Sequence, residues 1–340
     1  MRHILRPTRV SLVFLAALGA CQESGTDPVL LAPSESSADA VAGRWITRAN
    51  MPSDRVNTTT AAVTNSQGRT TLYVIGGQTT NSTTTCSGGL STVQAYNAST
   101  NKWTRKAPFP SPIQHTNGAG VIKGKIYLTG GCIRFKVLRG WTWMYDPATD
   151  SWTQKASMPV ETWGGHTGVI QDRLYVLSGC DGQEDCGNFS NVFFGRYNPN
   201  TDRWTPLPLP PSGSAQLFSG SAVIGGKFYV VGRRPLTDAI EVYDPATNRW
   251  TSLPGKGSDR KSVASAAIAG KLYMIAGFNR DGDRLATTSV YNPATNTWRN
   301  LAPAPRSGAG LAAGRVVVNG QPRIALVGGA RPANNFQFVP

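Results

Sequence analysis

Short apolar runs separated by glycine, proline and asparagine make up most of residues 43–340. No stretch keeps the i, i+3, i+4, i+7 apolar spacing of an amphipathic helix over three turns. The chain has 37 glycines and 23 prolines, together with many threonines, which favour turns and strands over helices. The pattern predicts an all-β chain of short strands.

One kind of run ends in a pair of small residues, as in Tyr127-Leu128-Thr129-Gly130-Gly131. A run rich in small residues precedes each copy, and short turns such as Lys123-Gly124-Lys125 join the two, as expected for a hairpin. In one variant copy Arg233 replaces the second glycine of the pair. The copies occupy residues 73–77, 127–131, 175–179, 229–233, 273–277 and 325–329.

A second kind of run places a Trp seven residues after a Tyr, as in Tyr291-Asn292-Pro293-Ala294-Thr295-Asn296-Thr297-Trp298. Proline presets φ for a turn, and Asn or Asp accepts a left-handed backbone or bonds back to the chain. The unit predicts a tight hairpin whose Tyr and Trp sit on neighbouring antiparallel strands. The copies occupy residues 96–103, 145–152, 197–204, 243–250 and 291–298.

Each repeat of about fifty residues is therefore expected to hold four strands: a small-residue strand, the strand ending in the small pair, the Tyr strand and the Trp strand. One four-stranded meander cannot bury both of its faces, whereas a ring of such meanders can. The small-residue strands suit the crowded positions nearest the axis of the ring.

These two runs, repeated in this order, resemble the kelch motif of β-propellers across essentially all of residues 43–340. The resemblance implies an all-β, six-bladed kelch β-propeller with four antiparallel strands per blade. The last copy stops at Phe338-Val339-Pro340, before any Trp, and the strand around Trp45 supplies the missing piece. The N-terminal strand is thus expected to complete the last blade and close the ring.

Residues 1–20 have the layout of a secretory signal, with three arginines followed by a short apolar run. Leu18-Gly19-Ala20-Cys21 resembles the lipobox of bacterial lipoproteins, which implies cleavage before Cys21 and lipid on its thiol. An ordinary signal with a chance cysteine is the alternative. Residues 21–42 are expected to form a flexible linker. Gln22 after the cysteine favours the outer membrane or cell surface over inner-membrane retention, and the periplasmic side remains open.

The chain is basic, with 34 Lys and Arg against 19 Asp and Glu. An anionic partner is one interpretation, and a generic basic surface is the other, because the positive residues are scattered. An exported protein rarely meets nucleic acid, which disfavours a nucleic-acid partner.

Four cysteines remain after Cys21, and an exported protein favours disulfides between them. A local Cys180–Cys186 bridge needs only a tight loop, and Cys86–Cys132 would join corresponding loops of adjacent blades. A zinc site is the alternative, but the spacing does not suit it and histidine is scarce. We therefore expect disulfides and no metal or other cofactor.

The loops after each second strand and those leading into each first strand should share one face, around the mouth of the central channel. Loops of unequal length on a rigid ring are the expected place for binding. Arg233 is the most informative basic residue there, as a fork for a carboxylate, sulfate or phosphate, with a structural or solvated arginine as the alternative. The candidate ligand-binding residues are Arg55, Arg134, Arg233, Arg234, Arg260, Arg306 and Arg331.

No catalytic set is visible. His115 and His166 occupy equivalent repeat positions and are interpreted as repeat residues. Galactose oxidase, a copper enzyme on a kelch propeller, needs two His, a ligand Tyr and a Tyr crosslinked to Cys, and no such set can be placed here. No Ser-His-Asp order, P-loop or Rossmann pattern occurs in a plausible context.

The sequence thus favours an exported, lipid-anchored binding module that meets the membrane only through its anchor and recognises an anionic glycan or an envelope protein. The alternative is an enzyme on acidic sugars, because the layout is similar to that of the periplasmic sialic acid mutarotases. An intracellular kelch adaptor is disfavoured by the secretory signal.

Overall fold

The computed structural model describes residues 43–79, 88–133, 137–181, 192–211, 220–231, 239–255, 260–329 and 334–340. Across these ranges every regular element is a strand, and there is no helix that could cross a membrane. The predicted signal and linker lie outside these ranges, as do Cys21, Cys86, Cys186, Arg134, Arg233, Arg234 and Arg331.

The strands form six four-stranded antiparallel sheets, which we number as blades in chain order. Blade 1 contains β2 (Thr59–Thr64), β3 (Thr70–Ile75), β4 (Val93–Asn97) and β5 (Lys102–Lys106). Blade 2 contains β6 (Gly118–Ile122), β7 (Lys125–Thr129), β10 (Thr142–Asp146) and β11 (Ser151–Lys155). A small hairpin of β8 (Cys132–Ile133) and β9 (Val137–Leu138) lies between β7 and β10. Blade 3 contains β12 (His166–Ile170), β13 (Arg173–Leu177), β14 (Phe194–Asn198) and β15 (Arg203–Pro206).

The second half of the chain repeats this arrangement. Blade 4 contains β16 (Gly220–Ile224), β17 (Lys227–Val231), β18 (Ala239–Asp244) and β19 (Arg249–Pro254). Blade 5 contains β20 (Ala264–Ile268), β21 (Lys271–Ile275), β22 (Thr288–Asn292) and β23 (Thr297–Leu301). Blade 6 contains β24 (Leu311–Val318), β25 (Gln321–Gly328), β26 (Asn335–Val339) and, from the other end of the chain, β1 (Arg44–Arg48).

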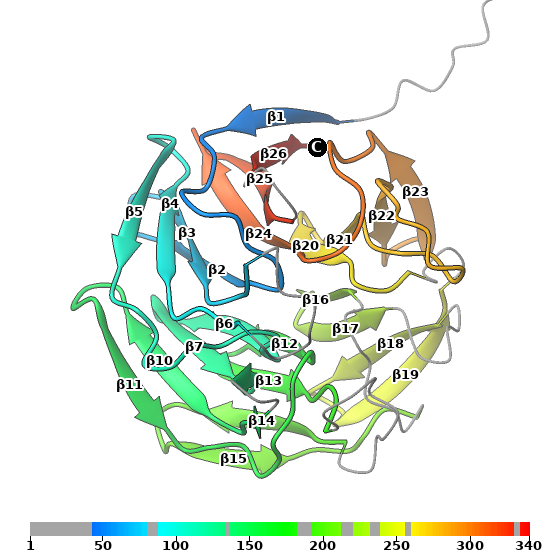
Figure 1. The fold of residues 1–340 in the computed structure, drawn as a ribbon. Coiled ribbons are helices and arrows are strands. Elements are labelled where there is room, and N and C mark those ends of the chain that lie inside the picture. The colour runs from blue at the N-terminus through cyan, green and yellow to red at the C-terminus, as the bar shows by residue number, and fades with distance from the viewer. Residues whose placement is uncertain are drawn as a thin grey trace, which may run out of the picture. The chain divides into compact units, whose positions relative to one another are not determined.

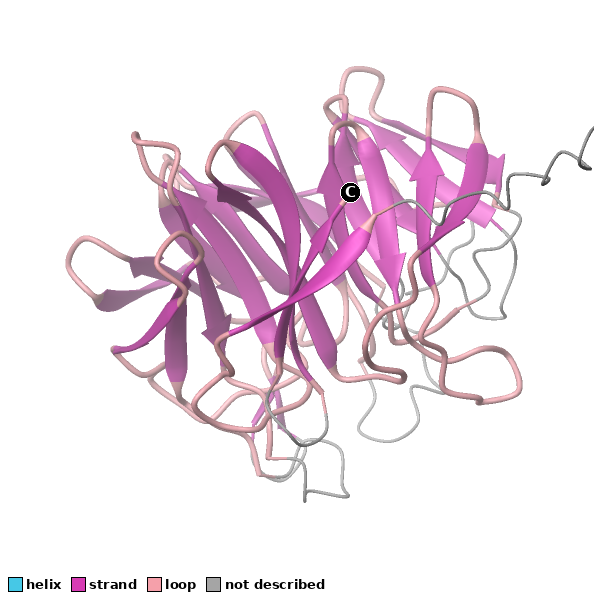
Figure 2. Ribbon diagram, turned by 90° about the horizontal axis from the view of Figure 1, so that it is seen from above, coloured by secondary structure: helices cyan, strands magenta, loops and turns pink. Residues whose placement is uncertain are grey.

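The blades close into a ring with their first strands innermost (Figure 1). These six strands, β2, β6, β12, β16, β20 and β24, contact one another in circular order. Seen from the side, the strands run between two layers of loops (Figure 2). The predicted six-bladed propeller is confirmed, including the small-residue strands at the axis.

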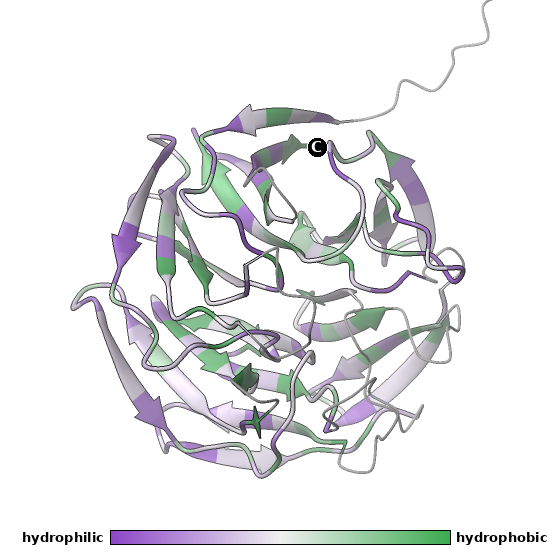
Figure 3. Cartoon of the chain, in the orientation of Figure 1, coloured by the Kyte–Doolittle hydropathy of each residue, from purple (hydrophilic) through white to green (hydrophobic). Residues whose placement is uncertain are grey.

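Hydrophobic packing between adjacent blades holds the ring together. Each interface has its own cluster of buried residues, and the innermost strands are more hydrophobic than the outermost ones (Figure 3). A Tyr on the second strand of one blade packs on the aromatic that opens the turn of the next. Tyr73 and Tyr145 have ring centroids 5.5 Å apart, within the range for favourable aromatic pairs. The same pairing joins Tyr127–Tyr197, Tyr175–Tyr243, Tyr229–Tyr291 and Tyr273–Phe338.

The turn between the third and fourth strands follows the predicted chemistry. The Tyr and Trp of each unit pair across the two strands, as Tyr291 does with Trp298. The Asn or Asp five residues after the Tyr has a positive φ, about 51° at Asn296, and its side chain accepts a hydrogen bond from the Tyr hydroxyl. Asn and Asp tolerate this left-handed conformation better than most residues. The same bond occurs at Asn101, Asp150, Asp202 and Asn248.

The Trp of four of the five units also bonds the segment that leaves the preceding blade. The Trp103 indole N–H donates to the Ala49 carbonyl at 2.8 Å, and the Ala49 amide donates to the Asn101 side chain at 2.9 Å. Ala49 directly follows β1, the last strand of the neighbouring blade. We call this pair of bonds the exit clamp. The indole bond recurs from Trp152 to Ala107, Trp204 to Ala156, Trp250 to Pro208 and Trp45 to Ala302.

Blade 6 closes the ring as predicted. Its strand order is β1-β26-β25-β24, so the two ends of the described chain pair with each other. Trp45 lies opposite Phe338 in the antiparallel register, and their ring centroids are 5.1 Å apart. Phe338 therefore takes the place that a Tyr has in the other five blades, without a hydroxyl to bond the turn.

Candidate functional site

A cavity of about 230 Å³ opens where the chain enters the innermost strands of four blades. At this mouth Asn57, His115, Ser262 and Gly310 all have positive φ, between 49° and 75°. A left-handed residue turns the chain sharply into the inner strand, and a side chain at Gly310 would meet Val56. The cavity is lined by Asn57, Thr58, Thr59, His115, Thr116, Ser262, Val263, Gly310 and Leu311.

Backbone hydrogen bonds link neighbouring blades around this cavity. The Asn57 amide donates to the Gly310 carbonyl at 3.3 Å, and the His115 amide donates to the Asn57 carbonyl at 3.4 Å. The Gly164 amide then donates to the His115 carbonyl at 2.9 Å. The cavity wall is thus tied from blade 6 through blades 1 and 2 to blade 3, which positions its side chains on a rigid frame.

The cavity lining combines polar side chains with the apolar Val263 and Leu311, and none of its side chains carries a formal charge. Burial lowers the pKa of His115 to about 4, so its imidazole is neutral at neutral pH. The Thr59 and Thr116 hydroxyls bond to each other. The Thr58 hydroxyl oxygen is buried and has no hydrogen-bond partner within the described part of the chain. Rotation about χ1 would turn this oxygen toward the cavity, where a ligand with hydroxyl groups would give it a partner.

Arg55 and Arg260 do not line the cavity, and their role in ligand binding stays a prediction. Both are buried, with 0% and 4% of their surface exposed. Arg55 donates to the carbonyls of Gly76 and Thr92 at 3.2 and 3.0 Å. Burial, with a smaller effect of Arg105, lowers the pKa of Arg55 to about 10.

Arg260 has the same role in blade 5. It donates to the carbonyls of Ala276 and Thr287 at 3.3 and 2.8 Å, and to the Ser289 hydroxyl at 3.0 Å. The carbonyls of this blade correspond to those that Arg55 binds in blade 1, at the small pair and just before the third strand. These two arginines therefore tie the second strand to the third.

The other candidate arginines are placed only in part. Arg306 is partly exposed on the segment before β24. Arg134, Arg233, Arg234 and Arg331 fall outside the described residues, so their role in binding stays a prediction. Of the described candidates, none is brought to the cavity wall.

Cys132 and Cys180 are buried and both are disulfide-bonded. Their predicted partners, Cys86 and Cys186, fall outside the described residues, so the two pairings remain predictions. His166 is buried on β12. Among the described residues no group of three or more His, Cys, Asp or Glu could hold a metal ion.

Sequence reasoning missed the residues that line the cavity. The signal for them is positional: two residues before the inner strand the chain carries Asn57, Gly164 and Ser262, each with a positive φ. Blade 2 reaches the same conformation one residue earlier, at His115. Aligning the repeats on the inner strand would have shown this position, but the small size of the side chains gave no chemical reason to choose it.

Two family models of the Kelch motif match this chain. One matches residues 62–110, 116–159 and 259–305, and the other matches residues 219–257. Together they cover just over half of the sequence.

Several curated proteins are similar in sequence. Kelch-like protein terF of Aspergillus terreus is 31% identical over 217 residues, which are 58% of this chain and 45% of that protein. An F-box/kelch-repeat protein of Arabidopsis thaliana is 28% identical over 179 residues, 45% of this chain and 37% of that protein. Kelch-like protein 36 of Mus musculus is 28% identical over 233 residues, which are 66% of this chain and 36% of that protein. The chain thus spans less than half the length of these relatives.

Among solved structures, that of YjhT superposes with a TM-score of 0.66 at 16% identity. The match covers 84% of this chain and 94% of that one. It shows a shared fold.

Proposed function

Because this chain belongs to the kelch-repeat proteins, we propose that it is an exported, lipid-anchored interaction module that binds an anionic glycan at its loop face. The observation that carries the proposal is the cavity at the channel mouth. Hydroxyl groups and an amide line it, and one of those hydroxyls, on Thr58, has no partner within the described residues. Such groups match the hydroxyls of a sugar.

The anionic part of the proposal rests on charge. The chain has an excess of 15 positive charges, and four arginines are expected on loops around the mouth. Guanidinium groups bind carboxylate and sulfate through paired hydrogen bonds. The cavity would hold the sugar ring, and the loop arginines would hold its acidic group.

A glycan array with the complete chain tests this proposal. We expect acidic glycans to bind, Thr58→Val to weaken binding by about tenfold, as for loss of one hydrogen bond, and Arg233→Ala to reduce the preference for acidic over neutral glycans. Thr100→Ala, in an exposed turn at the other end of blade 1, is the control. Absence of any glycan ligand, or equal effects of Thr58→Val and Thr100→Ala, would reject the proposal.

The lipid anchor and the membrane location of the protein are tested in a separate experiment. Replacing Cys21 with Ala should abolish labelling by a palmitate analogue and move the protein from the membrane fraction to the soluble fraction. Unchanged labelling of the Cys21→Ala variant would rule out lipid at this cysteine.

One observation favours a second candidate, an isomerase acting on an acidic sugar. His115 lines the cavity as a neutral imidazole, a form that can accept a proton. Interconversion of sialic acid anomers followed by NMR tests it. If the protein is such an isomerase, it should accelerate the interconversion, and the His115→Ala variant should not. If the parent protein does not accelerate the reaction, the isomerase hypothesis is rejected.

A further inference from the structure

Three guanidinium groups lie along a second cleft, at the outer edge of blade 3. Arg173, Arg196 and Arg203 come from the adjacent strands β13, β14 and β15. The cleft has a volume of about 530 Å³, and its polar lining includes Gln171, Asn198, Thr201 and Thr205. The hairpin turns after β12 and β14 contribute to it, so it lies at the opposite end of the strands from the channel mouth. We call it the blade-3 cleft.

Two neighbouring blades neutralise the basic residue that begins their second strand. In blade 2, Lys125 lies 2.7 Å from Asp146, and in blade 4, Lys227 lies 2.9 Å from Asp244. The aspartate in each case follows the Tyr of the turn. In blade 3 the corresponding pair is Arg173 and Asn198, so the carboxylate is replaced by an amide.

Arg196 is a departure from the repeat as well. The equivalent third-strand positions in four other blades carry Ala95, Met144, Val242 and Val290. All four side chains are apolar and pack in a hydrophobic cluster between two blades. Arg196 is instead exposed. It adds a positive charge beside Arg173, at a position that is uncharged in the four other blades.

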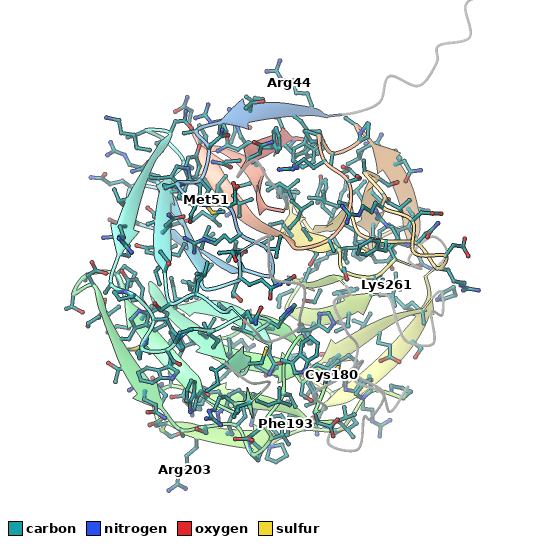
Figure 4. The ribbon with its side chains drawn as sticks, viewed as in Figure 1. Arg44, Met51, Cys180, Phe193, Arg203 and Lys261 are labelled. Carbon is teal, nitrogen blue, oxygen red and sulfur yellow. The ribbon has the colours of Figure 1, made fainter. Side chains whose placement is uncertain are left out.

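The carboxylates next to these arginines in sequence have other partners. Asp172 lies 3.8 Å from the Lys123 ammonium of blade 2. Asp202 accepts from the Tyr197 hydroxyl and from the Ala156 amide. Arg203 projects from the rim of the ring (Figure 4) and is exposed. The described residues give these three arginines no carboxylate within ion-pair distance.

We propose that the blade-3 cleft binds an acidic polysaccharide through its sulfate or carboxylate groups. Guanidinium forks from three strands match such oxyanions, and the amides and hydroxyls of Gln171, Asn198 and Thr201 match neighbouring sugar hydroxyls. The cleft volume falls in the range of small-molecule sites, enough for one or two sugar units. This site is separate from the channel mouth, so the two can be tested independently.

The repeat itself supplies the test variant. Asn198→Asp gives blade 3 the aspartate that blades 2 and 4 carry, which should pair with Arg173 and repel an anion. Asn292→Asp makes the same change in blade 5, where Lys271 takes the position of Arg173 but Val290 takes that of Arg196. Both variants add one negative charge at the same position of the turn.

Binding of the complete chain to a heparin oligosaccharide, oligogalacturonate, dextran and phosphatidylglycerol vesicles would be measured by calorimetry at physiological salt. We expect the sulfated or carboxylated oligomer to bind, dextran not to bind, Asn198→Asp to weaken binding by about tenfold, and Asn292→Asp to change it by less than about twofold. Arg196→Val should weaken it similarly, and Thr100→Ala, in the exposed turn of blade 1, should leave it unchanged.

Equal weakening by Asn198→Asp and Asn292→Asp would overturn the proposal in favour of a diffuse basic surface. Binding to the vesicles alone would overturn it in favour of a lipid surface. Binding of neither acidic oligomer would also reject it, provided that circular dichroism shows the fold of the chain intact.

Discussion

At the scale of single residues, the side chain that accepts the Tyr hydroxyl bond in the turn is an Asp in some blades and an Asn in others. Only the Asp can gain a proton as the pH falls. Blades 2 and 3 use Asp150 and Asp202, whereas blades 1, 4 and 5 use Asn. The Tyr145 hydroxyl, followed by the Ala107 amide, holds the pKa of Asp150 below its ordinary value. Burial acts to raise the pKa of Asp202, but the hydrogen bonds from Tyr197 and Ala156 outweigh it and the pKa falls.

We therefore expect the two aspartates to make the fold sensitive to acid. A carboxyl with a depressed folded pKa stabilises above its ordinary pKa of 3.8, and this contribution is lost as pH falls through the lower folded value. The Asp150→Asn/Asp202→Asn double variant should lose less stability than the parent below about pH 4. Urea unfolding between pH 2 and pH 7 measures the free energy of unfolding of both proteins. If the two free energies fall in parallel as the pH is lowered, the aspartates are not the source of the acid sensitivity.

A second prediction concerns Thr58 and Thr60, which lie on either side of Thr59. The Thr58 hydroxyl oxygen is buried without a partner in the described structure, whereas the Thr60 hydroxyl donates to the Ala313 carbonyl at 2.7 Å. Replacing Thr58 with Val should raise the free energy of unfolding, because an unsatisfied buried group is removed. Replacing Thr60 with Val should lower it by about 1 kcal/mol. Denaturant titrations that rank the two variants in the opposite order would refute this account.

Sequence reasoning succeeded at residues whose role is local and was less informative where a role depends on residues far away in the sequence. The Tyr, the Asn or Asp, and the Trp of each turn act within eight residues of one another, so their pairing was predictable. Arg55 was assigned to the ligand because it precedes the first strand of its blade, on the face that carries the loops. In the fold its guanidinium bonds the Gly76 and Thr92 carbonyls instead, and Thr92 is 37 residues away.

At the scale of elements, the exit clamp joins the outer strand of one blade to the turn of the next. Trp103→Phe keeps most of the ring packing but loses the indole bond to Ala49. It should lower the free energy of unfolding by about 1 kcal/mol. Trp298 is the matched control, because its indole nitrogen is buried without a partner among the described residues. Trp298→Phe should lower the free energy of unfolding by less than Trp103→Phe does. If chemical denaturation gives the same decrease for both variants, the indole bond contributes nothing to stability.

The order of strands within a blade was predictable because hairpin turns and small-residue patterns are local signals. The blade-3 cleft was not recognised, because the sequence shows Arg173, Arg196 and Arg203 as scattered basic residues. Only the antiparallel register, with Arg196 beside Tyr175 and Arg203 beside Asn198, brings them together.

At the scale of the whole molecule, blade 6 depends on both ends of the described chain. Phe338 is fully buried between Trp45 and Tyr273. Phe338→Ala should destabilise the whole ring by about 3–5 kcal/mol, in the range for a buried aromatic side chain. Because closing the ring couples all blades, fluorescence and circular dichroism should report one coincident transition at lower denaturant. Two separate transitions would mean that blade 6 opens alone.

The six-blade count and the closing strand were predictable because the missing Trp at one end has a counterpart at the other. The charge at the channel mouth could not be predicted, because the described cavity wall is neutral. The arginines assigned to the mouth include Arg55 and Arg260, which are buried inside their blades. Net charge describes a whole surface and does not locate a site on it.

The exit clamp has a consequence for how the chain is made. Each clamp reaches backward, from the Trp and turn of one blade to the residue that leaves the blade before it. During synthesis on the ribosome, a blade is therefore fastened only after its successor has emerged. Trp45 is the exception: it is translated first, and its partner Ala302 follows 257 residues later. The first strand of the propeller therefore has no strand partner until β26 (Asn335–Val339) has been synthesised.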